Sequence, residues 1–198
     1  IFPYILPRLR VKIPKLQICT LNLKETDQIT ELKKGDLDII FINQDFQNEH
    51  FASQLVLTES LIFMLPKQHP LAKFAEITVE QLNELELSLL SHKLSQPLSQ
   101  TILKYIDQHQ IQFKAIHETN SIAESIEAVH AGSSCAILPS YMQALATDQI
   151  VVRSLSHMLP CLDVFMCFHR TTPSQATEQF LEEIRFVFEL DQLALYAS

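Results

Sequence analysis

Three groups of polar residues each precede a predicted helix, and a helix N-terminus is a place where proteins readily bind anions. The groups are Lys24-Glu25-Thr26, residues 95–99 and Thr119-Asn120-Ser121. The backbone N–H groups of a first helical turn have no partner inside the helix, and the helix dipole adds positive potential there. Two interpretations stay open: the residues only cap their helices, or they also bind a small anion without any catalytic group.

Sequence motifs of common enzymes are absent. A dinucleotide-binding GxGxxG and a phosphate-binding P-loop each need closely spaced glycines, whereas this chain has 2 glycines, Gly35 and Gly132, far apart. There is no GxSxG motif. Residues 117–121 differ from the zinc motif HExxH because Ser121 stands where the second metal ligand should be. We therefore expect no enzyme, no metal and no cofactor.

Other titratable residues form no evident site. Glu182 and Glu183 are expected on a solvated helix surface. The remaining histidines are scattered and are expected at surface or capping positions: His50, His69, His92, His109, His130, His157 and His169.

The 4 cysteines, Cys19, Cys135, Cys161 and Cys167, lie in apolar, strand-like stretches and form no CxxC pair. In such a context cysteine behaves as a small hydrophobic residue. We expect reduced, buried core thiols rather than a disulfide or a zinc site.

Composition bounds the class of protein. The 198 residues are 47% hydrophobic and carry a net charge of −8, so an isolated nucleic-acid-binding module, which needs a basic face, is not expected. No apolar run approaches the ~20 residues of a membrane span, and no signal peptide is visible. The chain opens on Ile1 without Met, as though cut from something longer. We expect a cytoplasmic protein with no membrane partner.

The 2 glycines mark a repeated arrangement. Helical spacing begins after Thr26 and after Ser121, the expected N-caps, and ends at Gly35 and Gly132, where glycine suits a left-handed C′ position. A strand is predicted directly after each, at residues 37–42 and 135–139. Two similar α/β lobes are therefore expected.

The rest of the chain alternates strands and helices, which predicts mainly parallel sheets. We expect crossovers between lobes near residues 86–91 and 161–168, and a capping box at Thr78 and Gln81. The other predicted strands are residues 16–23, 51–57, 60–66, 85–91, 111–117 and 162–168; the other predicted helices are 1–11, 79–82, 102–109, 141–146 and 174–196.

The ordered set of motifs resembles the LysR-type transcriptional regulators over essentially the whole chain. The matching segments are Ile5-Leu6-Pro7 with Pro14, Leu16 and Ile18; Gly35-Asp36-Leu37-Asp38-Ile39-Ile40; Leu65-Pro66 with His69-Pro70-Leu71-Ala72; Ile77-Thr78-Val79-Glu80-Gln81-Leu82; and Glu118, Ser121-Ile122, Ala131-Gly132 and Ala136-Ile137-Leu138-Pro139. The resemblance implies an α/β fold of two Rossmann-like lobes joined by two crossover strands, like type 2 periplasmic binding proteins. Lobe I would comprise residues 1–87 and 166–198, and lobe II residues 88–165.

The same resemblance implies a function. A small polar or anionic effector would bind between the lobes and control transcription, and DNA would be bound only through an N-terminal winged helix-turn-helix domain absent from this chain. A homodimer or tetramer would pair the helix at residues 26–34 with that at 121–131. Residues 89–91 and 120–121 resemble the branch with the cyanate-operon activator. The implied effector contacts are Lys24, Thr26, Ser91, Ser95, Ser99, Thr119, Asn120 and Ser121.

Three departures from the family pattern qualify these expectations. Many members have Arg where this chain has Ser99 or Pro97, so a carboxylate effector would lose a bidentate partner. Ser134 replaces a second glycine. Peroxide-sensing members have a reactive cysteine near residues 94–95, and this chain has none there, so peroxide sensing is not expected.

Two other classes of protein remain as alternatives. A free-standing solute-binding protein would share the two-lobed plan and would need a secretion signal or lipid anchor upstream. An enzyme on a similar fold would need a convergent acid–base or nucleophile set, and the sequence shows none.

Overall fold

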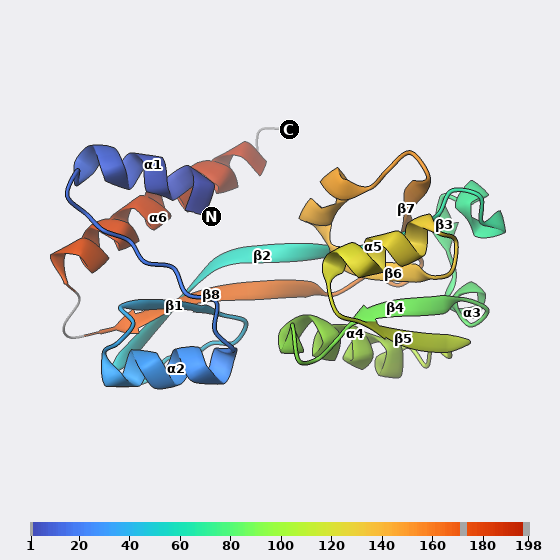
Figure 1. The fold of residues 1–198 in the computed structure, drawn as a ribbon, viewed down its shortest axis with the longest axis horizontal. Helices are drawn as coiled ribbons and strands as arrows, with labels where there is room; N and C mark the ends of the chain where they lie inside the picture. Colours follow the sequence, from blue (N-terminus) through green and yellow to red (C-terminus); the bar gives the residue numbers. More distant parts are fainter. Residues whose placement is uncertain (1, 171–173, 196–198) are drawn as a thin grey trace. The chain divides into compact units, whose positions relative to one another are not determined.

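The computed structural model describes residues 2–170 and 174–195, which form six α-helices, eight strands and two short 3₁₀ helices (Figure 1). None of the described helices is long and apolar enough to cross a membrane. The expected ends at Ile1 and Tyr196 lie outside the described residues. The elements are α1 (Phe2–Lys12), α2 (Glu25–Lys34), β1 (Ile39–Ile42), β2 (Phe51–Pro66), η1 (Pro70–Lys73), β3 (Glu76–Ile77), α3 (Val79–Leu82), β4 (Glu86–Leu90), α4 (Gln96–Gln108), β5 (Ala115–Thr119), α5 (Ile122–His130), β6 (Cys135–Pro139), η2 (Ser140–Leu145), β7 (Ile150–Leu155), β8 (Cys161–His169) and α6 (Gln175–Leu195).

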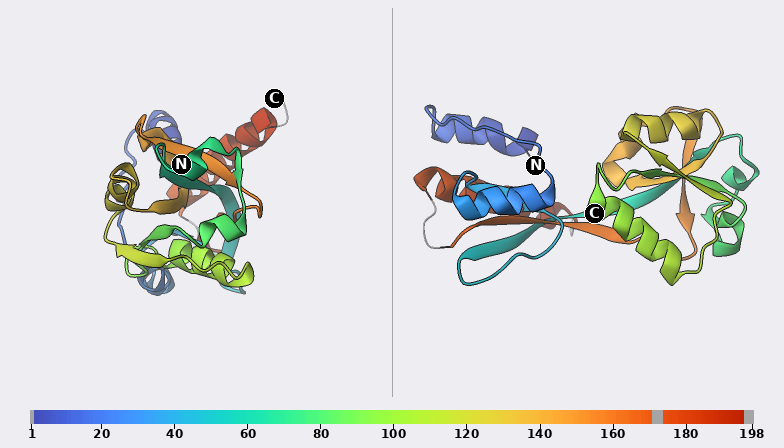
Figure 2. Two further views of the ribbon diagram at one scale, coloured as in Figure 1. Left: turned by 90° about the vertical axis from the view of Figure 1, so that its right-hand side faces the viewer. Right: turned by 60° about the horizontal axis from the view of Figure 1, so that its bottom comes forward.

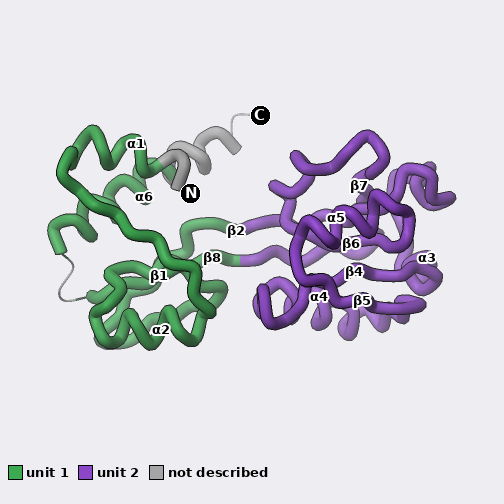
Figure 3. The backbone as a smooth tube through the Cα atoms, in the orientation of Figure 1, with its two compact units in different colours: residues 1–58, 163–198 green, residues 59–162 purple. Residues whose placement is uncertain are grey.

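The chain divides into two compact units, coloured separately in Figure 3. Unit 1 is Ile1–Thr58 with Asp163–Ser198, and unit 2 is Glu59–Leu162. The chain passes between the units within β2 and β8. The second crossover therefore falls in the expected segment, whereas the first lies near residue 58 and not near 86–91. The structure differs from the expected division because β4 pairs with β5 and β6, all inside unit 2.

Pairing between strands is mixed rather than mainly parallel. β4 runs parallel to β5 and β6, and β3 runs parallel to β7. By contrast, β8 with β1, and β2 with β6 and β7, are antiparallel. β2 carries the chain out of unit 1 and β8 returns it, so these two strands run in opposite directions. The strand–helix–strand repeats predict parallel pairing, but they say nothing of β2 and β8, which connect the two units and run in opposite directions.

The core of unit 1 lies on both faces of its strands. On one face α1 and α6 pack together through Ile5, Leu9 and Ile184, and on the other Leu32 of α2 packs on Ile40. Glu183, expected on a solvated surface, is buried on α6 and is paired with Arg8 and Lys12 of α1. Lys12 and then Arg8 hold the pKa of this carboxyl below its usual value against the effect of burial. The prediction of a solvated Glu183 was wrong because α1 covers this face.

In unit 2, α4 and α5 cover opposite faces of the strands (Figure 2). Alternation along β6 makes this possible, because successive side chains of a strand point to opposite faces. Cys135 and Ile137 pack in the cluster with Ile102 of α4, whereas Ala136 and Leu138 pack in the cluster with Ile126 and Val129 of α5.

The local signals at helix ends are largely confirmed. Gly35 and Gly132 have positive φ values of 84° and 81° just past α2 and α5. Ser121 caps α5, and the N–H of Thr78 donates to Gln81 Oε1 at 3.0 Å in the capping box of α3. Thr26 is not an N-cap, because α2 begins one residue earlier and Lys24 takes that position.

Several predicted elements were wrong in extent. The strand predicted at residues 16–23 is not formed, because this segment pairs with no other strand. Ile18 and Leu21 are accordingly 39% and 60% exposed and not buried as in a sheet. Residues 51–57 and 60–66 are one strand, because the polar break at Thr58 and Glu59 is stabilised by hydrogen bonds from Thr58 to Asp163 and from Ser140 to Glu59.

Other boundaries also differ. α4 begins at Gln96, well before the predicted residue 102, since Pro97 is favoured in a first turn. β5 begins at Ala115 and β7 was not predicted. Two of the four cysteines, Cys19 and Cys161, are exposed and not buried as expected, while Cys135 and Cys167 are buried.

Candidate functional site

The carboxyl ends of β4 and β5 lie side by side in unit 2. The two strands pair in parallel with Leu90 opposite Thr119, and the N–H of Ser91 donates to the carbonyl of Thr119 at 2.9 Å. α4 follows β4 after a short turn, and α5 follows β5. Two of the three predicted helix N-termini therefore start from neighbouring strand ends, which is where ligands of open α/β sheets bind.

The N-terminus of α4 has no acidic residue in its first turn. Its N-cap is Ser95, and in the described structure the Ser95 side chain makes no capping hydrogen bond. The first-turn N–H groups of a helix have no partner within it; in α4 they are those of Gln96 and Leu98, because Pro97 has none, and these two donors keep the capacity to bind an acceptor. His92 and Lys93 stand in the preceding turn and are exposed. We call residues 91–98 the α4 turn.

The buried hydroxyls of Ser91 and Ser99 hold the α4 turn in place. Ser99 is 1% exposed, and its Oγ donates to the carbonyl of Ser95 at 2.9 Å. The Oγ of Ser91 accepts from the N–H of Lys93 at 3.4 Å and donates to Glu118 Oε2 at 3.3 Å. Among the predicted contacts on this turn, Ser95 thus stands nearest to solvent, while Ser91 and Ser99 are buried.

The N-terminus of α5 is satisfied by its own side chains. The Oγ of Ser121 accepts from the N–H of Glu124 at 3.0 Å, and Glu124 Oε2 accepts from the N–H of Asn120 at 2.6 Å. The Glu124 carboxylate also places a negative charge at the positive end of the helix dipole. Sequence reasoning named the cap at Ser121 but missed Glu124, although Ser-x-x-Glu is a capping-box signature.

A pair of buried hydroxyls joins β5 to α5. Thr119 Oγ1 and Ser125 Oγ are 2.6 Å apart, and both residues are buried. Thr119 therefore positions the start of α5 and does not present its hydroxyl to solvent. Ser125 was missed, and its signal was its place four residues after Ser121, on the face that also carries Ile122, Ile126 and Val129.

The predicted contacts in unit 1 lie at the start of α2. Lys24 is the N-cap and Thr26 lies in the first turn, and both are exposed. The same turn contains two acidic residues, Glu25 and Asp27. Partial burial raises the pKa of Glu25, and hydrogen bonds from Gln44 and Asn43 partly offset this. Lys24 is thus a cation at the start of a helix that already has its own carboxylates.

The histidines form pairs and no larger site. His117 lies in β5, as predicted, and its Nε2 is 2.8 Å from Glu86 Oε2. The rings of His109 and His157, predicted to be scattered, stack with centroids 4.4 Å apart. In the part of the chain that the structure describes, no three His, Cys, Asp or Glu side chains gather in a way that could hold a metal ion.

Residues 1–188 match the family model of the LysR substrate binding domain, and the chain belongs to this family. Among curated proteins it is similar to the Hca operon transcriptional activator HcaR of Escherichia coli, with 24% identity over 91% of this chain and 61% of that protein. It is also similar to the transcriptional regulator AlsR of Bacillus subtilis, with 23% identity over 79% of this chain and 52% of that protein. The chain thus spans only part of the length of these relatives.

Solved structures confirm the expected fold. The BenM effector-binding domain with its effector benzoate superposes with a TM-score of 0.83 at 18% identity, covering 96% of this chain and 86% of that one. The regulatory domain of Synechocystis CcmR in complex with 2-PG has a TM-score of 0.78 at 16% identity, covering 94% and 92%. The fold is therefore the two-lobed α/β fold of periplasmic-binding-protein type. The relatives named are transcriptional regulators and not enzymes, and they do not favour a free-standing solute-binding protein. The predicted resemblance to the cyanate branch stays a prediction.

Proposed function

We propose that this chain is the effector-binding domain of a LysR-type regulator and binds a small anionic metabolite at the α4 turn. The observation that carries the proposal is the α4 turn, which leads into a helix N-terminus at a strand end, with no acidic residue in the first helical turn and no side-chain cap. An anionic group of the effector would accept hydrogen bonds from the first-turn N–H groups, beside Ser95.

The other predicted contacts surround this anchor in the proposal. Asn120 and Ser121 follow the neighbouring strand and are exposed, so they can bind a second polar group of the effector. Lys24 and Thr26, at the start of α2, remain proposed contacts of the effector. The BenM effector-binding domain has benzoate, a carboxylate, as its effector, which supports an anion here as well. Since Arg is absent at residues 97 and 99, backbone N–H groups would take the place of a bidentate side chain.

Binding would shift the equilibrium between two conformations of the domain, because a ligand favours the state that it contacts more fully. In the whole protein, this shift would change the spacing of DNA-binding domains in a homodimer or tetramer. In this proposal DNA is bound only through an upstream domain, α2 of one subunit pairs with α5 of another, and the protein acts in the cytoplasm.

A thermal-shift screen tests the proposal directly. The chain would be unfolded with and without small inorganic anions, amino acids, and aromatic or aliphatic acids. A ligand at a hundred times its dissociation constant stabilises by about 2.7 kcal/mol, which is a readable rise in the unfolding temperature. We expect at least one organic anion to produce it. Failure of all anions together with a response to cations would contradict the proposal.

Variants then locate the ligand that the screen finds. Ser121→Ala should weaken its binding severalfold, since Ser121 lies beside the proposed anchor, and Ser133→Ala is the matched control at the opposite end of α5. Isothermal titration of both variants compares them with the unchanged chain. Equal affinity in Ser121→Ala, Thr26→Ala and the control would remove these residues from the site.

A further inference from the structure

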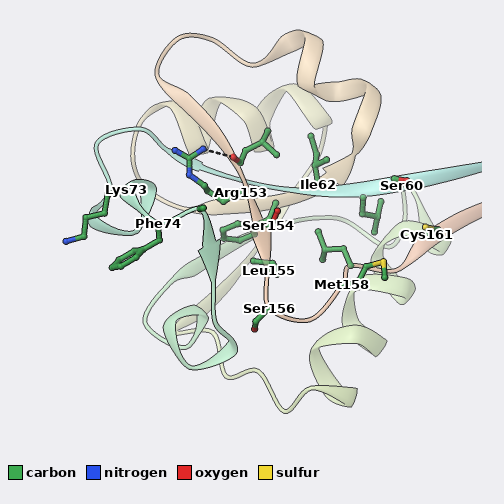
Figure 4. A pocket seen from close by; sticks show the side chains of 15 residues that line it. Ser60, Ile62, Lys73, Phe74, Arg153, Ser154, Leu155, Ser156, Met158 and Cys161 are labelled. Atoms are coloured by element: carbon green, nitrogen blue, oxygen red, sulfur yellow. Dashed lines mark hydrogen bonds between the residues drawn. The ribbon is translucent and has the colours of Figure 1, made fainter. Parts of the chain in front are cut away.

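A concave site lies wholly within unit 2 and shares no lining residue with the α4 turn. Its volume is about 790 Å³ and it is lined by β2, β7 and the segment after η1 (Figure 4). This volume falls in the range of roughly 300–1,000 Å³ typical of pockets for small molecules. We call it the β2–β7 pocket.

A change of strand partner creates this pocket. β7 pairs antiparallel with β2 up to Arg153, opposite Phe63, and then pairs in parallel with β3 through Ser154 and Leu155. As β7 leaves β2, the space beside Ser60–Ile62 is lined by the segment between β7 and β8, which includes Met158. The hollow is thus built by the sheet itself.

The floor and the rim of the pocket differ in polarity. Leu61, Phe63 and Leu155 form a buried apolar floor that belongs to the core of unit 2. At the rim, Phe74 is 40% exposed and Met158 is 87% exposed. Apolar side chains exposed together around a concavity mark a surface that gains from being covered. Methionine is suited to such a rim because it adapts to ligands of different shape.

The charged residues that line the pocket are all basic. The chain as a whole has 23 acidic and 15 basic residues, yet the lining contains Lys73 and Arg153 and no Asp or Glu. No ion pair is recorded for either cation in the described part of the chain; Lys73 lies 5.1 Å from the centre of the Phe74 ring. Both charged residues of the lining are therefore cations, while Glu59 and Glu76 adjoin the lining in the sequence.

The guanidinium of Arg153 is held in place before any ligand arrives. Its Nε and Nη2 donate to the carbonyl of Ala72 at 2.9 and 2.6 Å, and Nη1 donates to that of Val152 at 2.7 Å. These bonds use three of five N–H donors and neutralise no charge. Figure 4 shows Lys73, Phe74 and Arg153 at one end of the pocket and Met158 and Cys161 at the other.

We propose that the β2–β7 pocket is a second ligand site, which binds an amphipathic organic anion with its carboxylate toward Arg153 and Lys73 and its apolar chain toward Met158. The site is independent of the proposed effector site, because it uses none of the residues of the α4 turn.

Methyl NMR of the whole chain tests this assignment. The chain has 4 methionines, so ¹³C-methyl labelling gives one signal each; Met158 lines the pocket, while Met64 and Met166 are fully buried. Octanoate should shift the Met158 signal in a saturable manner and leave Met166 unchanged. Octylammonium, with the same chain and the opposite charge, and acetate, without the chain, should not. Met158→Leu assigns the signal.

Charge variants determine whether the cations bind the carboxylate. Arg153→Gln should weaken octanoate about tenfold, as the loss of a charge-assisted hydrogen bond does, and Lys73→Gln about two- to fivefold, because Lys73 is exposed. Lys104→Gln on α4 is the matched control and should leave the affinity unchanged. Lys73→Gln keeps the test valid if Arg153→Gln fails to fold, since its side chain holds no recorded hydrogen bond in the described structure.

The opposite results would overturn the assignment. It is wrong if the Met158 signal does not respond to octanoate, if octylammonium binds equally well, or if Lys73→Gln and Arg153→Gln, both folded, match Lys104→Gln. It is also wrong if Ser95→Asp, a change at the α4 turn, abolishes the Met158 response. That last result would place octanoate at the proposed effector site.

Discussion

The N-termini of α4 and α5 stand at the ends of neighbouring parallel strands, yet only one of them is open. Before α5, the N–H of Asn120 donates to the carboxylate of Glu124 at 2.6 Å, and Ser121 caps the helix. α4 has no acidic residue in its first turn and no side-chain cap at Ser95. Position at a strand end therefore does not by itself make an anion site; the residues of the first turn decide whether that position is free.

The same rule separates α2 from α4. Two carboxylates, Glu25 and Asp27, lie in the first turn of α2 and complement its dipole. An effector anion would be repelled by them unless Lys24 offset their charge. Of the three helix ends singled out from the sequence, α4 is thus the one that we propose as the anchor for an anion, and the other two are proposed to supply neutral or cationic contacts.

The largest effect is expected where a buried hydroxyl pair fixes the closed terminus. Ser125→Ala removes the closer partner of Thr119 Oγ1, 2.6 Å away, and leaves that buried hydroxyl only its longer bond to the Leu89 carbonyl, at 3.4 Å. The free energy of unfolding should fall by about 1–3 kcal/mol. Urea unfolding measures it, with Ser133→Ala as control, because Ser133 makes one exposed bond at the other end of α5. Equal losses in the two variants would show that the pair does not fix α5.

A carboxylate at the N-terminus of α4 should give this helix the same kind of N-terminal stabilisation that Glu124 gives α5. Ser95→Asp places a carboxylate at the N-cap, which should raise stability by about 0.5–1 kcal/mol. The same carboxylate should weaken an anionic effector by about tenfold or more, because it competes for the first-turn N–H groups. Thermal unfolding and titration of one sample report the two changes together. A variant that gains stability and still binds the anion fully would show that the effector does not use this turn.

The reverse change opens the closed terminus. Glu124→Ala removes both the bond to Asn120 and the favourable charge, and should cost about 1 kcal/mol of stability. Glu124→Gln keeps an acceptor and should lie between the two. Glu127→Ala, exposed on the same helix, is the control for helix propensity. If Glu124→Ala unfolds at the same urea concentration as Glu127→Ala, the Glu124 carboxylate at the N-terminus of α5 does not contribute to the free energy of unfolding.

Local chemistry explains which parts of this arrangement could be predicted from sequence. Gly35, Gly132 and the box at Thr78 act through bonds within a few residues, so their spacing is sufficient. The burial of Glu183 under α1 depends on a contact between the two ends of the chain, and spacing contains no trace of it. The partner change of β7 is equally non-local, which is why neither β7 nor the β2–β7 pocket was predicted.

The same distinction between local and non-local contacts separates the residues of the candidate site. The residue types at its strand ends were read from the sequence, because caps and strand ends are local features. Which hydroxyls face solvent was not, since Ser99 and Thr119 are buried by neighbours that only the fold brings together. Asn120 and Ser121 are exposed, and each is hydrogen-bonded to Glu124, a few residues along the chain.

The smallest effect on stability is expected at α2. It distinguishes a residue that stabilises the fold from one that only contacts the effector. Thr26→Ala removes an exposed hydroxyl for which no hydrogen bond is recorded in the described structure. The bond from Thr30 Oγ1 at 2.8 Å goes to the backbone carbonyl of Thr26, which alanine keeps. Stability should change by less than about 0.5 kcal/mol, because alanine also favours the helix. Thr30→Ala on the same helix is the control. A fall in effector affinity in Thr26→Ala alone, measured by titration, would identify Thr26 as a contact. Unchanged affinity in both would leave the anion held by the α4 turn without a contribution from Thr26.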